Sequence, residues 1–265
     1  MKGVIREQPA PLAVSALRAD LADRAEVEAV LRAFSPDVVI HSAALADAEV
    51  CERHPDRAQR DNVVATRTLA RASVRSGARF IAISTDLVFG GEAALSTEDS
   101  LTNPRLEYGR SKVRAEHAAL EECPETVILR VGLVCGKGHG PRRTGSESLA
   151  DRLRRGESVT LYEDEWRTPI DPESVGGAIE ALLERPSQKG ILHIAGPERL
   201  TRVELGEKVA AVLGLDVSLI KHARQASHVG APRPRDVSLD CGRAKSELSW
   251  TARPLEVAIR EGRTG

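Results

Sequence analysis

The sequence predicts an α/β protein: a doubly wound parallel sheet with helices on both faces. Strand and helix patterns alternate along most of the chain, and the strand segments are short, continuous apolar runs typical of buried parallel strands. Capping residues stand where several helices would begin and end. At 265 residues, the chain is long enough for one large domain or for one domain with a small lobe.

The first half of the chain supplies the regular strand–helix rhythm. A helix over 23–34 begins with Asp23 as a plausible N-cap and Glu26 three residues later, which is a capping-box spacing. The elements that follow are a strand over 37–43, a helix from about 58 to 76 ended by Gly77, a strand over 79–85, a helix over 107–122 and a strand over 126–132.

The regular alternation of strand and helix patterns changes after about residue 140. The expected elements are a Gly- and Arg-rich loop over 138–145, a helix near 146–155, a strand over 158–164, a helix over 172–185, a strand over 191–196, a helix over 201–214, and a loop followed by a helix over 231–248. We therefore expect a main domain of residues 1–137 plus about 171–196, and a small lobe of about 138–170 and 197–265.

Composition excludes several classes of function. The chain is 41% hydrophobic and 29% charged with a net charge of −1, which indicates a soluble globular protein with no nucleic-acid partner. No apolar run approaches a membrane span and no signal peptide opens the chain. The cysteines lie far apart without metal-type spacing, so we expect reduced thiols in a cytoplasmic protein and no metal site: Cys51, Cys123, Cys135 and Cys241.

One candidate site is a tyrosine placed four residues before a lysine, Tyr108 and Lys112, in a chain with only two tyrosines. On a helix the two would share a face. An ammonium near a phenol lowers the phenol pKa, so the tyrosine can exchange a proton with a carbonyl or alcohol. An incidental surface pair is the alternative. The 79–85 strand ends in Thr85, next to Asp86, and parallel strands bind ligands at their carboxyl ends, so Thr85 and Tyr108 are expected to converge.

Several motifs occur together and in order. They are "HSAALADAEVCERHPDRAQRDN" (41–62), "ISTDLVFGG" (83–91), "YGRSK" (108–112), "LRVGLVCG" (129–136), "WRTPIDPESVGGAI" (166–179) and "RPRDVSLD" (233–240). With them the chain resembles the extended short-chain dehydrogenase/reductase superfamily, and within it the dTDP-4-dehydrorhamnose reductase family. The resemblance implies a Rossmann-like NAD(P)-binding domain with a C-terminal substrate lobe.

The resemblance also implies a reaction. In this family a hydride passes from NADPH or NADH to a 4-keto sugar carried on a nucleoside diphosphate, as in dTDP-rhamnose biosynthesis. Mapped onto this chain, Tyr108 protonates the developing alkoxide, Lys112 lowers the Tyr108 pKa and contacts the nicotinamide ribose, and Thr85 donates a hydrogen bond to the sugar carbonyl. Asp86 carries over as a catalytic-site residue without an assigned role. The alternative for Thr85 and Asp86 is a strand-end cap that holds the next loop.

Cofactor and substrate residues carry over in the same way. The expected cofactor-binding residues are Arg6, Asp20, Leu21, Ala43, Ala44 and Asn62, together with Tyr108 and Lys112. A positive charge at Arg6 suits the 2′-phosphate of NADP, although an ordinary exposed arginine is equally compatible with that position. Arg167 and Arg233 are candidates to bind the substrate diphosphate. The family often forms homodimers, so the resemblance makes a homodimer possible, and no interface can be identified from the sequence.

The sequence departs from the family's pattern at its N-terminal end. A dinucleotide-binding fold begins with a strand, a Gly-x-x-Gly-x-x-Gly loop and a helix, whereas "GVIRE" (3–7) resembles the second strand of the family. We expect that the sequence starts downstream of the true start or is a fragment, that strand edges in the sheet are left unpaired or re-pair, and that the cofactor is held weakly.

Two other functions stay open. One is a non-catalytic nucleotide-binding protein, like the beta-type regulatory subunit of a methionine adenosyltransferase, which the missing glycine loop favours and the Tyr108–Lys112 pair disfavours. The other is a nucleotide-sugar epimerase or dehydratase, because dehydratases carry an acidic residue beside the threonine, as "STD" (84–86) does.

Overall fold

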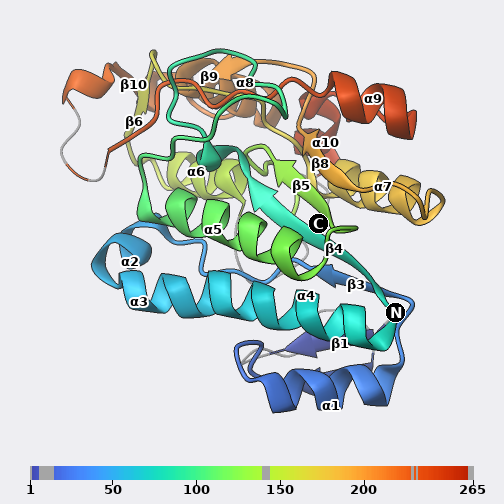
Figure 1. Cartoon of the computed structure of the whole chain (residues 1–265). Coiled ribbons are helices and arrows are strands. Elements are labelled where there is room, and N and C mark those ends of the chain that lie inside the picture. Colours follow the sequence, from blue (N-terminus) through green and yellow to red (C-terminus); the bar gives the residue numbers. More distant parts are fainter. Residues whose placement is uncertain (1, 6–14, 139–143, 228–229, 231, 262–265) are drawn as a thin grey trace. The chain divides into compact units, whose positions relative to one another are not determined.

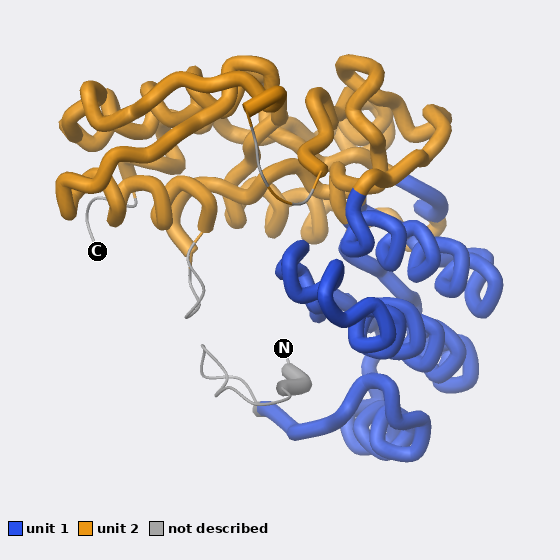
Figure 2. Tube along the Cα trace, turned by 90° about the vertical axis from the view of Figure 1, so that its left-hand side faces the viewer, with its two compact units in different colours: residues 1–84, 106–129, 188–191 blue, residues 85–105, 130–187, 192–265 orange. Residues whose placement is uncertain are grey.

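The computed structural model describes residues 2–5, 15–138, 144–227, 230 and 232–261 (Figure 1). The chain forms two compact units, shown in separate colours in Figure 2. Unit 1 comprises Met1–Ser84, Leu106–Leu129 and Gln188–Ile191, and unit 2 comprises Thr85–Arg105, Arg130–Ser187 and Leu192–Gly265. The division of the sequence into a main domain and a substrate lobe, with the bounds expected above, stays a prediction.

Up to the middle of the chain, the predicted strands and helices are present, together with short elements that were not predicted. In chain order the elements are β1 (Lys2–Ile5), β2 (Ser15–Arg18), α1 (Arg24–Phe34), β3 (Val38–His41), α2 (Ala48–Arg53), α3 (Pro55–Ala58), the π-helical turn η1 (Gln59–Val64), α4 (Ala65–Ser76), β4 (Arg79–Thr85), the 3-10 turn η2 (Asp86–Val88), α5 (Glu107–Glu122) and β5 (Val127–Val131). Asp23 caps α1 by accepting from two backbone N–H groups, and Gly77 ends α4 with φ 72°, a left-handed conformation that glycine adopts without strain.

A four-stranded sheet has the order β3-β4-β5-β8, where β8 is Gly190–Ile194. β3 and β4 are parallel, with Val38 opposite Arg79. Phe80 and Ile81 point to opposite faces of β4, and both are 0% exposed. Strand β4 is therefore covered on both faces, and the predicted α/β fold with a parallel sheet is confirmed.

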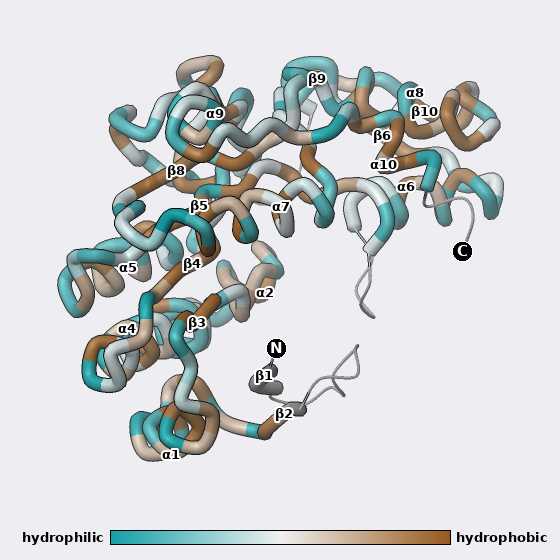
Figure 3. The backbone as a smooth tube through the Cα atoms, turned by 90° about the vertical axis from the view of Figure 1, so that its right-hand side faces the viewer, coloured by the Kyte–Doolittle hydropathy of each residue, from teal (hydrophilic) through white to brown (hydrophobic). Residues whose placement is uncertain are grey.

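Three helices pack against one face of β4. Val27 of α1, Leu69 of α4 and Ala119 of α5 share a buried cluster with Phe80, and α4 and α5 lie side by side (Figure 1). Hydrophobic residues concentrate along β4 and β8, whereas the helices alternate hydrophobic and hydrophilic residues (Figure 3). The core of unit 1 thus holds the helix α5, which carries Tyr108 and Lys112.

The two N-terminal strands form a sheet of their own. β1 pairs with β2 in parallel, with Lys2 opposite Ser15. Within the described residues, β3 pairs with β4 only, and Ile40 of β3 is 41% exposed. The sequence predicted the short opening strand but not β2.

Unit 2 is built from shorter elements. They are α6 (Gly145–Arg154), β6 (Val159–Tyr162), β7 (Trp166–Arg167), α7 (Pro172–Leu183), β9 (Leu200–Thr201), α8 (Arg202–Leu213), η3 (Val217–Leu219), β10 (Ile220–Ala223), η4 (Gln225–Ser227), α9 (Gly242–Leu248) and α10 (Leu255–Glu261). β6 pairs with β10 in parallel, and β7 pairs with β9 antiparallel. Helix α8 lies so close to β6 that a Cβ at Gly206 would meet Leu161 Cδ1 at 2.2 Å. In the described part of the chain, no helix combines the length and apolar character needed to cross a membrane.

Candidate active site

Helix α5 carries the tyrosine and the lysine one turn apart. Tyr108 is half-buried, whereas Lys112 is 4% exposed. The Lys112 ammonium donates a hydrogen bond to the carbonyl oxygen of Ile83 on β4 at 2.8 Å. Burial lowers the pKa of Lys112 to about 8, and the Glu116 carboxylate opposes that shift. A lysine held in this way is easily biased between its charged and neutral forms near neutral pH.

Asn62 connects the loop after β3 to helix α5. It lies in the π-helical turn η1, a kind of distortion that is frequent at functional sites, and is 1% exposed. Its side chain accepts from the Leu45 N–H at 2.7 Å and donates to Ser111 Oγ at 2.8 Å. Ser111 Oγ in turn donates to the Tyr108 carbonyl at 2.7 Å. Asn62 therefore fixes the loop that contains Ala43 and Ala44 against the helix that carries Tyr108.

A buried histidine lies in the same unit. His41 Nε2 is 3.0 Å from Thr66 Oγ1, and that hydroxyl donates its proton to the Asn62 carbonyl at 2.6 Å. The hydroxyl must therefore accept from His41, which places the proton of a neutral imidazole on Nε2. Burial, and then the nearby Lys112 charge, lower the His41 pKa to about 3, so His41 is uncharged at neutral pH.

The end of β4 forms the turn that holds Thr85 and Asp86 in unit 2. Thr85 Oγ1 accepts from the Leu87 N–H at 3.2 Å and donates to Asp86 Oδ1 at 3.0 Å. The strand-end cap considered as the alternative for Thr85 is therefore present. It leaves the catalytic role a prediction, because a hydroxyl rotor can redirect its single proton when a carbonyl binds.

Asp86 is a buried carboxyl group with an incomplete set of partners. It is 4% exposed, and its Oδ2 has no hydrogen-bond partner among the described residues. Burial raises its pKa to about 6, although the Arg167 charge and the Thr85 hydrogen bond lower it. Asp86 therefore changes charge in the range where enzymes commonly work.

Replacing Asp86 with Asn should change how stability depends on pH. The pKa rises from 3.8 unfolded to about 6 folded, so folding favours the protonated form and the parent loses stability as pH rises through this window. Above pH 6, Asp86→Asn should be more stable than the parent by up to about 3 kcal/mol, and below pH 4 the two should converge. Urea unfolding at several pH values measures this, and Asp99→Asn, at an exposed carboxylate, should show no such change.

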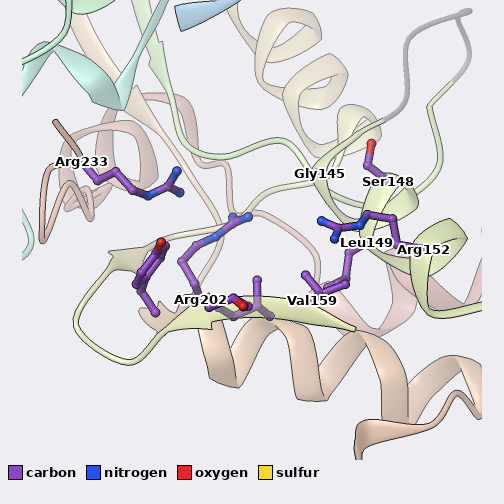
Figure 4. A pocket seen from close by; sticks show the side chains of 10 residues that line it. Gly145, Ser148, Leu149, Arg152, Val159, Arg202 and Arg233 are labelled. Atoms are coloured by element: carbon purple, nitrogen blue, oxygen red, sulfur yellow. The ribbon is translucent and has the colours of Figure 1, made fainter. Parts of the chain in front are cut away.

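Arginine side chains line a pocket in unit 2. It has a volume of about 320 Å³, and Arg152, Arg202 and Arg233 all line it. Figure 4 shows their guanidinium groups directed toward the same space from three elements. The Arg233 guanidinium also lies over the Tyr162 ring, 5.3 Å from its centroid. Several guanidinium groups around one space suit a phosphorylated ligand.

One buried carboxylate contacts two of these arginines, Arg233 and Arg202, and a third arginine outside the pocket lining. Glu165 is 1% exposed and accepts two hydrogen bonds from Arg233, at 2.6 and 3.0 Å. It also pairs with Arg167 at 2.9 Å and lies 3.9 Å from Arg202. Burial acts to raise the Glu165 pKa, but Arg167 and Arg233 hold it below its ordinary value. Three guanidinium groups around one carboxylate leave a net charge of about +2.

The two arginines named from sequence thus have different positions. Arg233 lines the pocket, whereas Arg167 is 7% exposed, pairs with Glu165 and is not among the lining residues. Sequence reasoning missed Arg202, Arg152 and Glu165, which come from separate elements with no common motif. It also missed Glu116, although its spacing of four residues from Lys112 on one helix was a usable signal.

The two residues predicted to contact adenine, Asp20 and Leu21, already have partners within unit 1. Asp20 accepts from the Ala22 N–H at 3.0 Å and pairs with Arg60, and Leu21 packs against the cluster around Phe80. Arg6 lies outside the described residues. No group of three or more His, Cys, Asp or Glu residues in the described part of the chain is arranged to hold a metal ion.

The fold and the Tyr-x-x-x-Lys helix define a class: an α/β protein of the short-chain dehydrogenase/reductase type. The family model described as the RmlD substrate binding domain matches residues 4–262. The chain therefore belongs to that family.

Two curated relatives represent different functions. "Methionine adenosyltransferase 2 subunit beta" of Danio rerio is 33% identical over 252 residues, covering 92% of this chain and 77% of that protein. "Probable low-salt glycan biosynthesis reductase Agl14" of Haloferax volcanii is 33% identical over 241 residues, covering 89% of this chain and 80% of that protein. The relatives of this chain thus include a protein named as a reductase and one named as a subunit of another enzyme.

Solved structures support the fold and the class of ligand in this group. A hypothetical dTDP-4-dehydrorhamnose reductase from Sulfolobus tokodaii has a TM-score of 0.84 at 27% identity, covering 97% of this chain and 98% of that one. MoeE5 in complex with UDP-glucose and NAD has a TM-score of 0.80 at 26% identity, covering 97% of this chain and 86% of that one. Nicotinamide dinucleotides and nucleotide sugars are therefore ligands found among its structural relatives.

Proposed function

We propose that the chain reduces a nucleotide-linked 4-keto sugar with NADPH or NADH, as a dTDP-4-dehydrorhamnose reductase does. The observation that carries the proposal is the pair on α5: a half-buried Tyr108 and, one turn later, a buried Lys112 whose pKa is lowered to about 8. Family membership and the named reductase among the relatives support the same reaction class.

Tyr108 is the proton donor in this reaction. Its phenol delivers a proton to the sugar oxygen as negative charge develops there, and the neighbouring Lys112 ammonium stabilises the phenolate that remains. Thr85 donates a hydrogen bond to the same oxygen, where it has the largest effect in the transition state. In the structure that hydroxyl donates to Asp86 at 3.0 Å, so its single proton turns from Asp86 to the substrate oxygen when the sugar binds.

The chain has groups that fit a nicotinamide cofactor, which would supply the hydride when bound. An ammonium has three N–H donors, and among the described residues one from Lys112 goes to Ile83, so the others can serve ribose hydroxyls. Asn62 fixes the loop of Ala43 and Ala44. Asp20 and Leu21 at the adenine and Arg6 at a 2′-phosphate complete the proposed set, and Arg6 would favour NADPH.

The arginine pocket is the proposed site for the substrate's nucleoside diphosphate. A net charge of about +2 around Glu165 balances the charge of a diphosphate, and Arg233 and Arg202 present guanidinium groups that can bind it in bidentate fashion. Arg167, which is not among the lining residues, would hold Glu165 in position through their ion pair. We further expect a cytoplasmic homodimer that takes part in nucleotide-sugar metabolism such as dTDP-rhamnose biosynthesis.

A second candidate is a non-catalytic, nucleotide-binding regulatory subunit. The observation in its favour is the 33% identity to the Danio rerio methionine adenosyltransferase subunit. A non-catalytic subunit has no evident use for a buried Lys112 with a lowered pKa, one turn from Tyr108. Stable association with a methionine adenosyltransferase catalytic chain, together with no turnover, would support this second candidate.

The direct test supplies the purified protein with dTDP-4-dehydrorhamnose and NADPH. The proposal expects stoichiometric loss of nicotinamide absorbance and formation of a dTDP-6-deoxyhexose. An NADPH titration by fluorescence, without sugar, separates failure to bind the cofactor from failure to react. Tight cofactor binding with sugar conversion but no net NADPH consumption would contradict the reductase and indicate an epimerase or dehydratase.

A further inference from the structure

A third residue continues the face of α5 that carries Tyr108 and Lys112. Glu116 lies one turn beyond Lys112, so the three side chains follow one another along the helix. Glu116 is 4% exposed, and Ser84 Oγ on β4 donates to Glu116 Oε1 at 2.5 Å. A carboxylate this deeply buried needs partners, since an uncompensated buried charge is strongly unfavourable.

Lys112 and Glu116 face a common small cavity. It has a volume of about 10 Å³, and its lining includes both residues together with Ile83, Ser84 and Thr66. That is about the space of a single water molecule. The lining includes one basic and one acidic residue from the same helix, and the Glu116 charge acts to raise the Lys112 pKa.

Among the described residues that line this cavity, Lys112 and Glu116 are the charged ones. On β3, His41 is neutral because its pKa lies near 3. On α4 the cavity is lined by the Thr66 hydroxyl, and on β4 by the Ser84 hydroxyl and residues without charge. Among the described groups that face Lys112, Glu116 is the counter-charge.

We infer that Glu116 is a positioning residue that keeps the Lys112 ammonium charged, with Ser84 fixing the orientation of the carboxylate. This rests on the proposed function in one respect: the Lys112 charge matters for catalysis because it stabilises the Tyr108 phenolate. Glu116 itself touches neither substrate nor cofactor in this scheme. Its effect reaches the reaction through the protonation state of Lys112.

The test reads the Lys112 titration directly. Protein labelled with [ε-¹³C]lysine has seven lysines to resolve, and Lys112→Arg assigns the signal of interest. In the parent the midpoint is expected at about 8. In Glu116→Gln the midpoint should fall by more than about one pH unit, a tenfold or greater loss of proton affinity, because burial then acts without a counter-charge.

Two further variants make the result unambiguous. Glu121→Gln removes an exposed carboxylate from the same helix and should leave the midpoint unchanged. If Glu116→Gln does not fold, Glu116→Leu removes the charge while filling its space, and the same fall is expected. An unchanged Lys112 midpoint in a folded Glu116 variant would overturn the inference.

This readout needs no substrate, so it separates the inference from the proposed function. A shifted midpoint in a protein without reductase activity would uphold the Lys112–Glu116 coupling and reject the reaction. An active reductase whose Glu116→Gln variant keeps both the midpoint and the pH–rate profile of the parent would uphold the reaction and reject the role of Glu116.

Discussion

Replacing Tyr108 with Phe should reduce kcat for ketosugar reduction by about 10²- to 10⁴-fold, the usual contribution of a positioned general acid. The substitution removes the phenolic proton and keeps the aromatic ring. Without that proton the developing alkoxide must take one from another donor such as water, without the positioned phenol. Steady-state kinetics with saturating NADPH and keto sugar measure the effect.

The control for this variant is binding and folding. NADPH affinity and the melting temperature should stay close to those of the parent, because Phe retains the ring. A variant that binds cofactor, melts like the parent and keeps its kcat within about threefold, well short of a general-acid effect, would remove Tyr108 from the mechanism and weaken the reductase reading as a whole.

Replacing Glu165 with Gln should destabilise the protein by about 3–5 kcal/mol, which is typical when one partner of a buried ion pair is removed. Glu165 is 1% exposed and contacts Arg233, Arg167 and Arg202. Without the carboxylate, three guanidinium groups repel one another and lose their acceptor. Chemical denaturation at neutral pH measures the loss.

A nearby carboxylate provides the matched control. The side chain of Glu163 is 46% exposed and pairs with His222 and Arg224, so Glu163→Gln should change stability by no more than about 0.5 kcal/mol. Pyrophosphate or dTDP should raise the melting temperature of Glu165→Gln more than that of the parent, because the anion replaces the lost charge. Equal stability of the two variants would contradict the role of Glu165.

The longer elements of the fold could be predicted from the sequence, and several short ones could not. Helix α5 and strand β4 have the predicted bounds because their apolar periodicity is strong and their ends are marked. β7 and β9 each comprise two residues, which is too short for a periodic pattern. Their pairing depends on contacts between distant segments, so tertiary structure decides it.

The candidate site likewise has one part that could be predicted from the sequence and another that could not. Tyr108 and Lys112 are readable because helical spacing places them on one face, and Glu116 extends that spacing by one more turn. The Glu165 cluster was not readable in full: it joins residues before β7, at the start of α8 and near Arg233, which only folding brings together. Whether Thr85 and Tyr108 act on one substrate oxygen stays a prediction.

The most direct test of the central claim follows the hydrogen itself. NADPH deuterated at the transferable C4 position is incubated with the protein and dTDP-4-dehydrorhamnose, and the sugar product is examined by mass spectrometry and NMR. A reductase places one deuterium on C4 of the sugar for each NADPH oxidised. Sugar product without deuterium, or bound NADPH that is never oxidised, would contradict the account.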